Sequence, residues 1–121
     1  MRQGRRIPPA VAAQIRQNVR AVRSATPGVD PERLWSLLED AHVLSQPWAL
    51  PHVHVHGAML MFALRTRDLP EVRGQLLRML VAGPGSTSGR YPPGNIGRAT
   101  VPATQPMPIP EHLQALLDAD A

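Results

Sequence analysis

Residues 30–45, DPERLWSLLEDAHVLS, decide the fold because they carry a complete signal for an amphipathic helix. Asp30 can cap the first turn, Pro31 fits the first helical position, and Glu32 suits the positive end of the helix dipole. The apolar residues that follow recur at helical spacing and share one face: Leu34, Leu37, Leu38, Ala41 and Leu44. The stretch therefore predicts a helix that buries this face against its neighbours.

Similar signals predict a helix before this stretch and a final one near the end of the sequence. Pro8-Pro9 begins the earlier helix, which residues 26–28 (Thr-Pro-Gly) end. Its apolar stripe is Val11, Ile15, Val19 and Val22. We expect residues 1–7 to be flexible and residues 111–118 to form a short terminal helix.

Two further helices are predicted between residues 51 and 83. The third runs from about Pro51 to Arg67, and residues 68–71 (Asp-Leu-Pro-Glu) indicate a capping box for the fourth. Gly83-Pro84 is expected to stop the fourth helix. Its predicted buried side consists of Val72, Leu76, Met79 and Leu80.

Residues 84–110 differ in kind from the helical stretches. They hold seven of the 14 prolines and several glycines, yet they also carry apolar residues such as Ile96, Val101 and Ile109. We expect a long irregular loop that wraps over the helices. The predicted fold is all-α, a single domain over residues 1–121 with four to five short helices. They would form antiparallel hairpins, arranged as a tetratricopeptide-like array or a small bundle.

The composition of the chain excludes several kinds of functional site and bears on its partners and location. The absence of cysteine excludes disulfides, zinc–thiolate sites, iron–sulfur clusters and thiol catalysis. Every basic residue is arginine, which together with 14 prolines is typical of a GC-rich bacterial genome.

The net charge is +4, and residues 1–29 hold six arginines and no acid, but no aromatic residues interleave with them. Nucleic acid is not expected as a partner. No apolar run suits a signal peptide or a membrane span, so we expect a cytoplasmic location without membrane association.

The candidate site is a cluster of four histidines between residues 42 and 56. Glu39 and His42 are three residues apart on one helix, and His52 and His56 are four apart on the next. Antiparallel helices joined by a short turn would bring these four side chains to one point. One carboxylate and three imidazoles suit a mononuclear iron or zinc site, with copper or manganese as alternatives.

Two alternatives to this helical site stay open. Residues 51–56 (PHVHVH) could instead form a strand that places His52, His54 and His56 on one side. Alternatively, Glu39 and His42 could be a local pair with no metal, and the histidines could be surface residues. A histidine beside a glutamate can also act as a general base without metal.

Four further residues are candidates for lining the site. Met59 lies seven residues after His52, on the same face of the predicted helix, and is either a ligand or a core side chain. Gln46 follows the end of the second helix. Residues 94–97 (Gly-Asn-Ile-Gly) predict a tight turn, so Asn95 and Arg98 would reach the site if the loop folds over it. Gln75 and Arg78 are weaker candidates.

Several strings together resemble a bacterial family known as domain of unknown function 3703. They are residues 38–46 (LEDAHVLSQ), 52–56 (HVHVH), Arg67-Asp68 with Glu71, Gly74-Gln75 and Arg78, residues 93–97 (PGNIG), and residues 106–111 (PMPIPE). The likeness covers roughly residues 33–113. It implies that Glu39, His42, Gln46, His52, His56, Asn95 and Gly97 match the recurring pattern of the family. His54 and Ile96 depart from it, which favours the helical pair over the three-histidine strand.

The predicted function is that of a metal-binding helical protein, with a small iron or zinc metalloenzyme of unknown substrate as one form of it. A non-catalytic interaction module and a metal carrier or sensor are the alternatives. The expected partner is a metal ion or a small molecule, and homodimer formation is left open.

Overall fold

Five helices and no strand make up the part of the chain that the structure describes, residues 6–119 of a computed structural model. The helices are α1 (Pro9–Arg23), α2 (Pro31–Ser45), α3 (Ala49–Arg65), α4 (Leu69–Ser88) and α5 (Glu111–Asp118). The all-α prediction is confirmed, and the strand reading of residues 51–56 is wrong because they lie within α3. Of the segment expected to be flexible, residues 1–5 lie outside the described residues.

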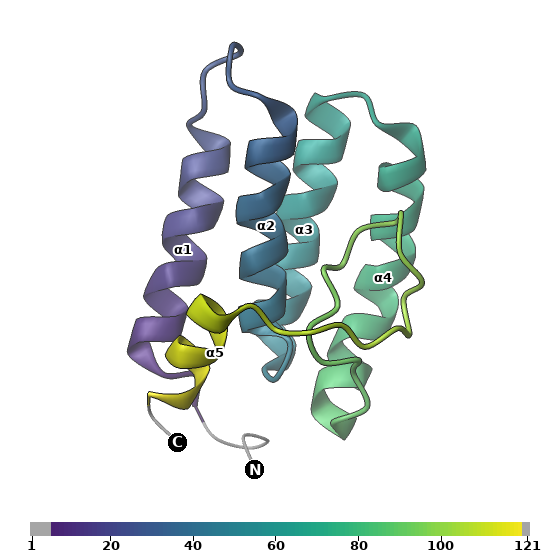
Figure 1. Cartoon of the computed structure of the whole chain (residues 1–121). Helices are drawn as coiled ribbons and strands as arrows, with labels where there is room; N and C mark the ends of the chain where they lie inside the picture. The colour runs from purple at the N-terminus through teal and green to yellow at the C-terminus, as the bar shows by residue number, and fades with distance from the viewer. Residues whose placement is uncertain (1–5, 120–121) are drawn as a thin grey trace.

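The helices pack as a small bundle. Figure 1 shows α1 to α4 side by side in chain order, each running opposite to the one before, with α5 against the ends of α1 and α2. The core is mostly aliphatic and contains the predicted stripe of α1 and most of the predicted stripe of α2. Trp35 meets Phe62 edge to face inside it, with ring centroids 5.0 Å apart. Among the described residues, no helix combines the length and apolar character needed to cross a membrane.

Capping fixes where α2 and α4 begin. The Asp30 carboxylate accepts from the Glu32 backbone N–H at 3.1 Å, and the Asp68 carboxylate accepts from the Glu71 N–H at 3.3 Å. The reciprocal half of the predicted capping box is absent, because the Glu71 carboxylate is bound by other groups. α3 begins at Ala49, two residues earlier than predicted, because Pro51 falls in the first turn, where its missing N–H costs nothing.

The predicted stop of α4 at Gly83-Pro84 is wrong. α4 continues through Pro84 to Ser88 and ends at Gly89, whose φ of 74° is left-handed. Pro84 removes the hydrogen bond to the Leu80 carbonyl, but Leu80 is exposed, so water can satisfy that oxygen. The irregular segment therefore starts after residue 88 rather than at 84, and the extra turn carries Ser86 into the interior.

The predicted buried side of α4 is wrong at Leu76 and Leu80, which are exposed, whereas Val72 packs against the core and Met79 is half-buried. The fully buried residues of this helix are mostly polar: Glu71, Gln75, Ala82 and Ser86. Residues 90–110, without helix or strand, cross this region before α5 (Figure 1). α4 thus turns polar groups toward the bundle, and these groups surround the histidines of α2 and α3.

Candidate metal centre

Three histidines converge on one point between α2 and α3. The Nε2 atom of His42 lies 3.0 Å from that of His52 and 3.0 Å from that of His56, and the last two are 3.2 Å apart. His42 comes from the last turn of α2, while His52 and His56 are one turn apart on α3. The short connection between the helices places these turns side by side. All three side chains are buried and form a group able to hold a metal ion.

Each ring also contacts an acceptor through its other nitrogen. His42 Nδ1 lies 2.7 Å from the Asn95 backbone oxygen, His52 Nδ1 lies 2.7 Å from Ser86 Oγ, and His56 Nδ1 lies 2.7 Å from Gln75 Oε1. A carbonyl oxygen can only accept, so His42 Nδ1 must carry a proton. Two of the partners are side chains of α4 and one is backbone of the loop.

The network around the two side-chain partners fixes the other two tautomers. Ser86 Oγ donates its single proton to the Gln46 carbonyl at 2.5 Å, which leaves only its lone pairs for His52. Gln75 Nε2 donates to Glu71 Oε2 at 3.0 Å and to the Gly97 carbonyl at 2.9 Å, so its oxygen faces His56. All three histidines are therefore protonated at Nδ1 when neutral, and their Nε2 lone pairs face one another.

Burial keeps these rings neutral. It is the largest cause that lowers the pKa of His52 to about 3 and that of His56 to about 4, and it lowers the pKa of His42 well below the usual 6.5. Neighbouring rings also disfavour a proton: His56 and His52 lower the pKa of His42 further, and His56 lowers that of His52. A neutral imidazole with a free Nε2 is the form that binds metals.

The spacing of the three nitrogens matches a metal ion. At metal–nitrogen bonds of about 2.0–2.1 Å, an ion would lie about 1 Å from the plane of the three Nε2 atoms. The nitrogen–metal–nitrogen angles would then be about 91–106°, between the octahedral and tetrahedral values. The three rings would occupy one side of the ion and leave its other side open.

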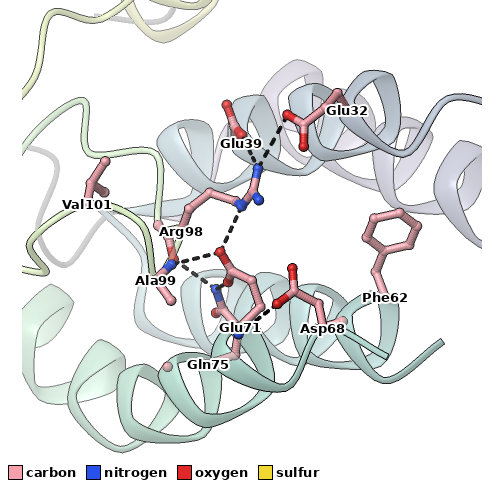
Figure 2. Close-up of polar contacts among 12 residues, drawn as sticks. Glu32, Glu39, Phe62, Asp68, Glu71, Gln75, Arg98, Ala99 and Val101 are labelled. Atoms are coloured by element: carbon pink, nitrogen blue, oxygen red, sulfur yellow. Dashed lines mark hydrogen bonds and ion pairs between the residues drawn. The ribbon is translucent and has the colours of Figure 1, made fainter. Parts of the chain in front are cut away.

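Behind the histidines, a buried charge network ties α4 to the loop and to α2. Glu71 is 2% exposed; its Oε1 accepts from Arg98 Nε at 2.8 Å and from the Ala99 N–H at 3.0 Å. Figure 2 shows Arg98 reaching from Glu71 across to Glu39 and Glu32 on α2. The Arg98 guanidinium also lies over the Trp35 ring, 4.1 Å from its centroid. Through Gln75, this network connects to His56.

Two of the predicted metal ligands or neighbours lie outside the histidine group. Glu39 is not part of it; its carboxylate pairs with Arg98 at 3.3 Å. The i, i+3 spacing to His42 placed both on one side of α2, but Arg98 offers Glu39 a charge partner there. Met59 is fully buried in the hydrophobic core, where it packs as a core side chain.

The predicted lining residues Gln46 and Asn95 hold the loop over the site. Gln46 donates to the Pro92 carbonyl at 2.8 Å and accepts from the Gly94 N–H at 3.1 Å. The Asn95 side chain bonds the loop internally, while its backbone oxygen contacts His42. Gly97 has a φ of 84°, and a Cβ there would lie 2.6 Å from His42 Cδ2. The loop therefore packs directly on the His42 ring.

A cavity of about 530 Å³ opens beside the histidines. All three rings line it, together with Gln46, Asn95 and Gly97, and its outer walls come from the second half of α4 and from the loop. Arg98 is not among the lining residues; Arg78 and Arg90 are. The site is thus a buried group of three imidazoles at the wall of a pocket large enough for a small molecule.

Sequence reasoning missed Ser86 and gave Gln75 and Arg78 little weight. The signal that could have found them is a polar stripe at helical spacing, formed by Glu71, Gln75, Arg78 and Ser86 and interrupted only by Ala82. The expected stop at Gly83-Pro84 hid its last member.

Comparison with known proteins identifies a family for this chain. Residues 9–117 match the model of a family described as "Protein of unknown function (DUF3703)", in agreement with the resemblance seen in the sequence. Neither the curated proteins nor the solved structures include a significant match to this chain.

Proposed function

Because the chain belongs to the family of unknown function DUF3703, whose description names no activity, we propose a function from the geometry of its site. The protein is a metalloprotein that holds one divalent transition metal ion on His42, His52 and His56. The open side of this ion faces the cavity, so that a small molecule can reach it.

One observation carries this proposal: three acceptors orient three buried rings so that their Nε2 lone pairs meet. Three lone pairs at 3.0–3.2 Å repel one another unless something positive lies among them. A proton is a poor choice, because burial disfavours an imidazolium here. A cation bound by all three nitrogens removes the repulsion, and the outer hydrogen bonds orient its ligands, as is usual around metal-bound histidines.

The ligand set favours zinc or iron. Imidazole nitrogens suit zinc, copper, iron and nickel, whereas manganese prefers oxygen ligands. The carboxylates of Glu39 and Glu71 do not serve as further ligands of the metal ion, because both are paired with Arg98. Three neutral ligands leave the full charge of the ion in place, which would acidify a bound water and polarise a bound carbonyl. A small metalloenzyme with Lewis-acid chemistry is the form of this proposal that we favour.

A metal carrier or sensor is the second form. The buried outer network favours a resident ion over a transferred one, because release would require separating His52 and His56 from Ser86 and Gln75. Exchange of bound zinc against a radioactive or isotopically enriched zinc pool distinguishes the two. A resident cofactor exchanges slowly, and a cargo ion exchanges quickly with a chelating acceptor.

Metal analysis of protein purified without a histidine tag tests the proposal. We expect one zinc or iron ion per chain after loading, and less than a tenth of that in His42→Ala and His56→Ala. His54→Ala is the matched control, because His54 lies on the same helix between the ligands but is exposed. Equal metal content in all variants, or none in the loaded native protein, would rule the centre out and leave an interaction module.

A further inference from the structure

The charges around the cavity do not balance once an ion is bound. Three neutral imidazoles leave a charge of +2, and Arg78 and Arg90 in the cavity wall add to it. Glu71 and Glu39 both pair with the single cation Arg98, so together they offset at most one of these positive charges. The cavity of the loaded protein would therefore keep a net positive charge.

Of the two arginines in the cavity wall, Arg78 is partly buried and Arg90 is exposed. Its terminal nitrogens donate to the Gly74 and Val101 carbonyls at 3.2 and 2.9 Å. Its Nε–H is buried without a hydrogen-bond partner, and no ion pair joins Arg78 to a carboxylate within the described part of the chain. Arg78 therefore keeps an unused donor on a side chain that lines the cavity.

Arg78 and the three histidines line the same cavity. An anion bound in it can therefore contact the open side of the metal ion and the Arg78 side chain together. Arginine is well suited to this, because its planar donors match a carboxylate or a phosphate.

The remaining walls are mostly apolar. Leu77, Val81, Ala82 and Pro84 of α4 face the cavity, as does Ala103 of the loop. A free inorganic anion would leave these side chains without contact, whereas the apolar part of an organic anion would bury them. The wall therefore favours an organic anion of moderate size over phosphate or sulfate.

We propose that the cavity binds a small organic carboxylate whose charged end ligates the metal ion beside Arg78 and whose apolar body packs on Leu77, Val81 and Ala82. The proposal rests on the proposed metal centre and names the class of its ligand. The carboxylate supplies the negative charge that the three histidines lack.

Cobalt-loaded protein tests this, because the visible absorption of Co²⁺ reports changes in its ligands. Hexanoate, acetate, hexanamide and inorganic phosphate are the probes. Hexanoate should shift the cobalt bands saturably and bind at least tenfold more tightly than acetate or phosphate, and hexanamide should not shift them. Arg78→Gln should weaken hexanoate at least tenfold, whereas Arg73→Gln, an exposed arginine on the same helix, should not.

The outcomes separate the two proposals. Failure to bind Co²⁺ would overturn the metal centre itself. Cobalt bound with no response to hexanoate, or with phosphate as the tighter ligand, would overturn only the carboxylate proposal. The comparison of acids on the native protein needs no variant, so it stands even if Arg78→Gln folds poorly. Equal response to hexanoate and hexanamide would likewise overturn the role of charge.

Discussion

Gly97→Ala is expected to disrupt the metal centre from the loop side without touching a ligand. A Cβ at residue 97 would lie 2.6 Å from His42 Cδ2, whereas carbon atoms pack at about 3.5–4.0 Å. Relieving that overlap requires the His42 ring or the loop to move by about 1 Å. A shift of that size in Nε2 would stretch a metal bond of about 2.1 Å beyond bonding distance.

The same substitution also strains the backbone. Gly97 has a φ of 84°, and a left-handed conformation costs an L-residue about 1–2 kcal/mol. Overpacking in a tight interior adds about 1–3 kcal/mol. We therefore expect the free energy of unfolding of the metal-free protein to fall by about 2–5 kcal/mol, and zinc affinity to fall at least tenfold.

Competition with a chromophoric chelator measures the zinc affinity, and urea denaturation of the metal-free protein measures stability. Gly28→Ala is the control, because a Cβ there would meet nothing within 4 Å. If Gly97→Ala kept native zinc affinity while Gly28→Ala behaved as expected, the loop would not hold His42 in place, and the reasoning about the site would be refuted.

Three other predictions follow from the buried network. Gln75→Leu removes the acceptor that orients His56 and should reduce zinc affinity about 10–100-fold in the same chelator assay; unchanged affinity would contradict the outer-ligand role. Arg98→Met leaves the Glu71 carboxylate buried and unpaired, and should cost about 3–5 kcal/mol in urea denaturation; a loss below about 1 kcal/mol would show that the ion pair is dispensable. The third concerns pH. Burial lowers the pKa of the three site histidines, so the unfolded chain takes up protons below pH 6.5 while the folded chain does not. The metal-free protein should therefore keep full stability above about pH 6.5 and lose it toward pH 4, with a slope approaching about 4 kcal/mol per pH unit for three protons. A flat pH profile of denaturation over this range would contradict the burial of neutral rings.

The sequence predicted the parts of the fold that local signals control. Asp30 and Asp68 cap helices as expected, and the apolar stripe of α1 is buried. The histidines were predictable for the same reason, since the i, i+4 spacing of His52 and His56 fixes their common face once α3 is helical. The short connection between α2 and α3 then brings His42 to them.

The rest depended on contacts between residues far apart in the chain. Leu76 and Leu80 looked like core residues because apolar periodicity normally marks the buried face. Instead, α4 buries polar side chains that hydrogen-bond the histidines. Glu39 was expected beside the histidines, but its carboxylate pairs with Arg98, which lies in the loop, far along the chain. No local pattern predicts such a pairing.

The most direct test of the central claim is the position of bound metal in a crystal of zinc-loaded protein. Anomalous scattering collected at the zinc edge should give one strong peak per chain, about 2.0–2.1 Å from the Nε2 atoms of His42, His52 and His56. A peak bound by Glu39, a peak at the surface away from α2 and α3, or three histidines still in contact with one another beside an empty centre would contradict the account.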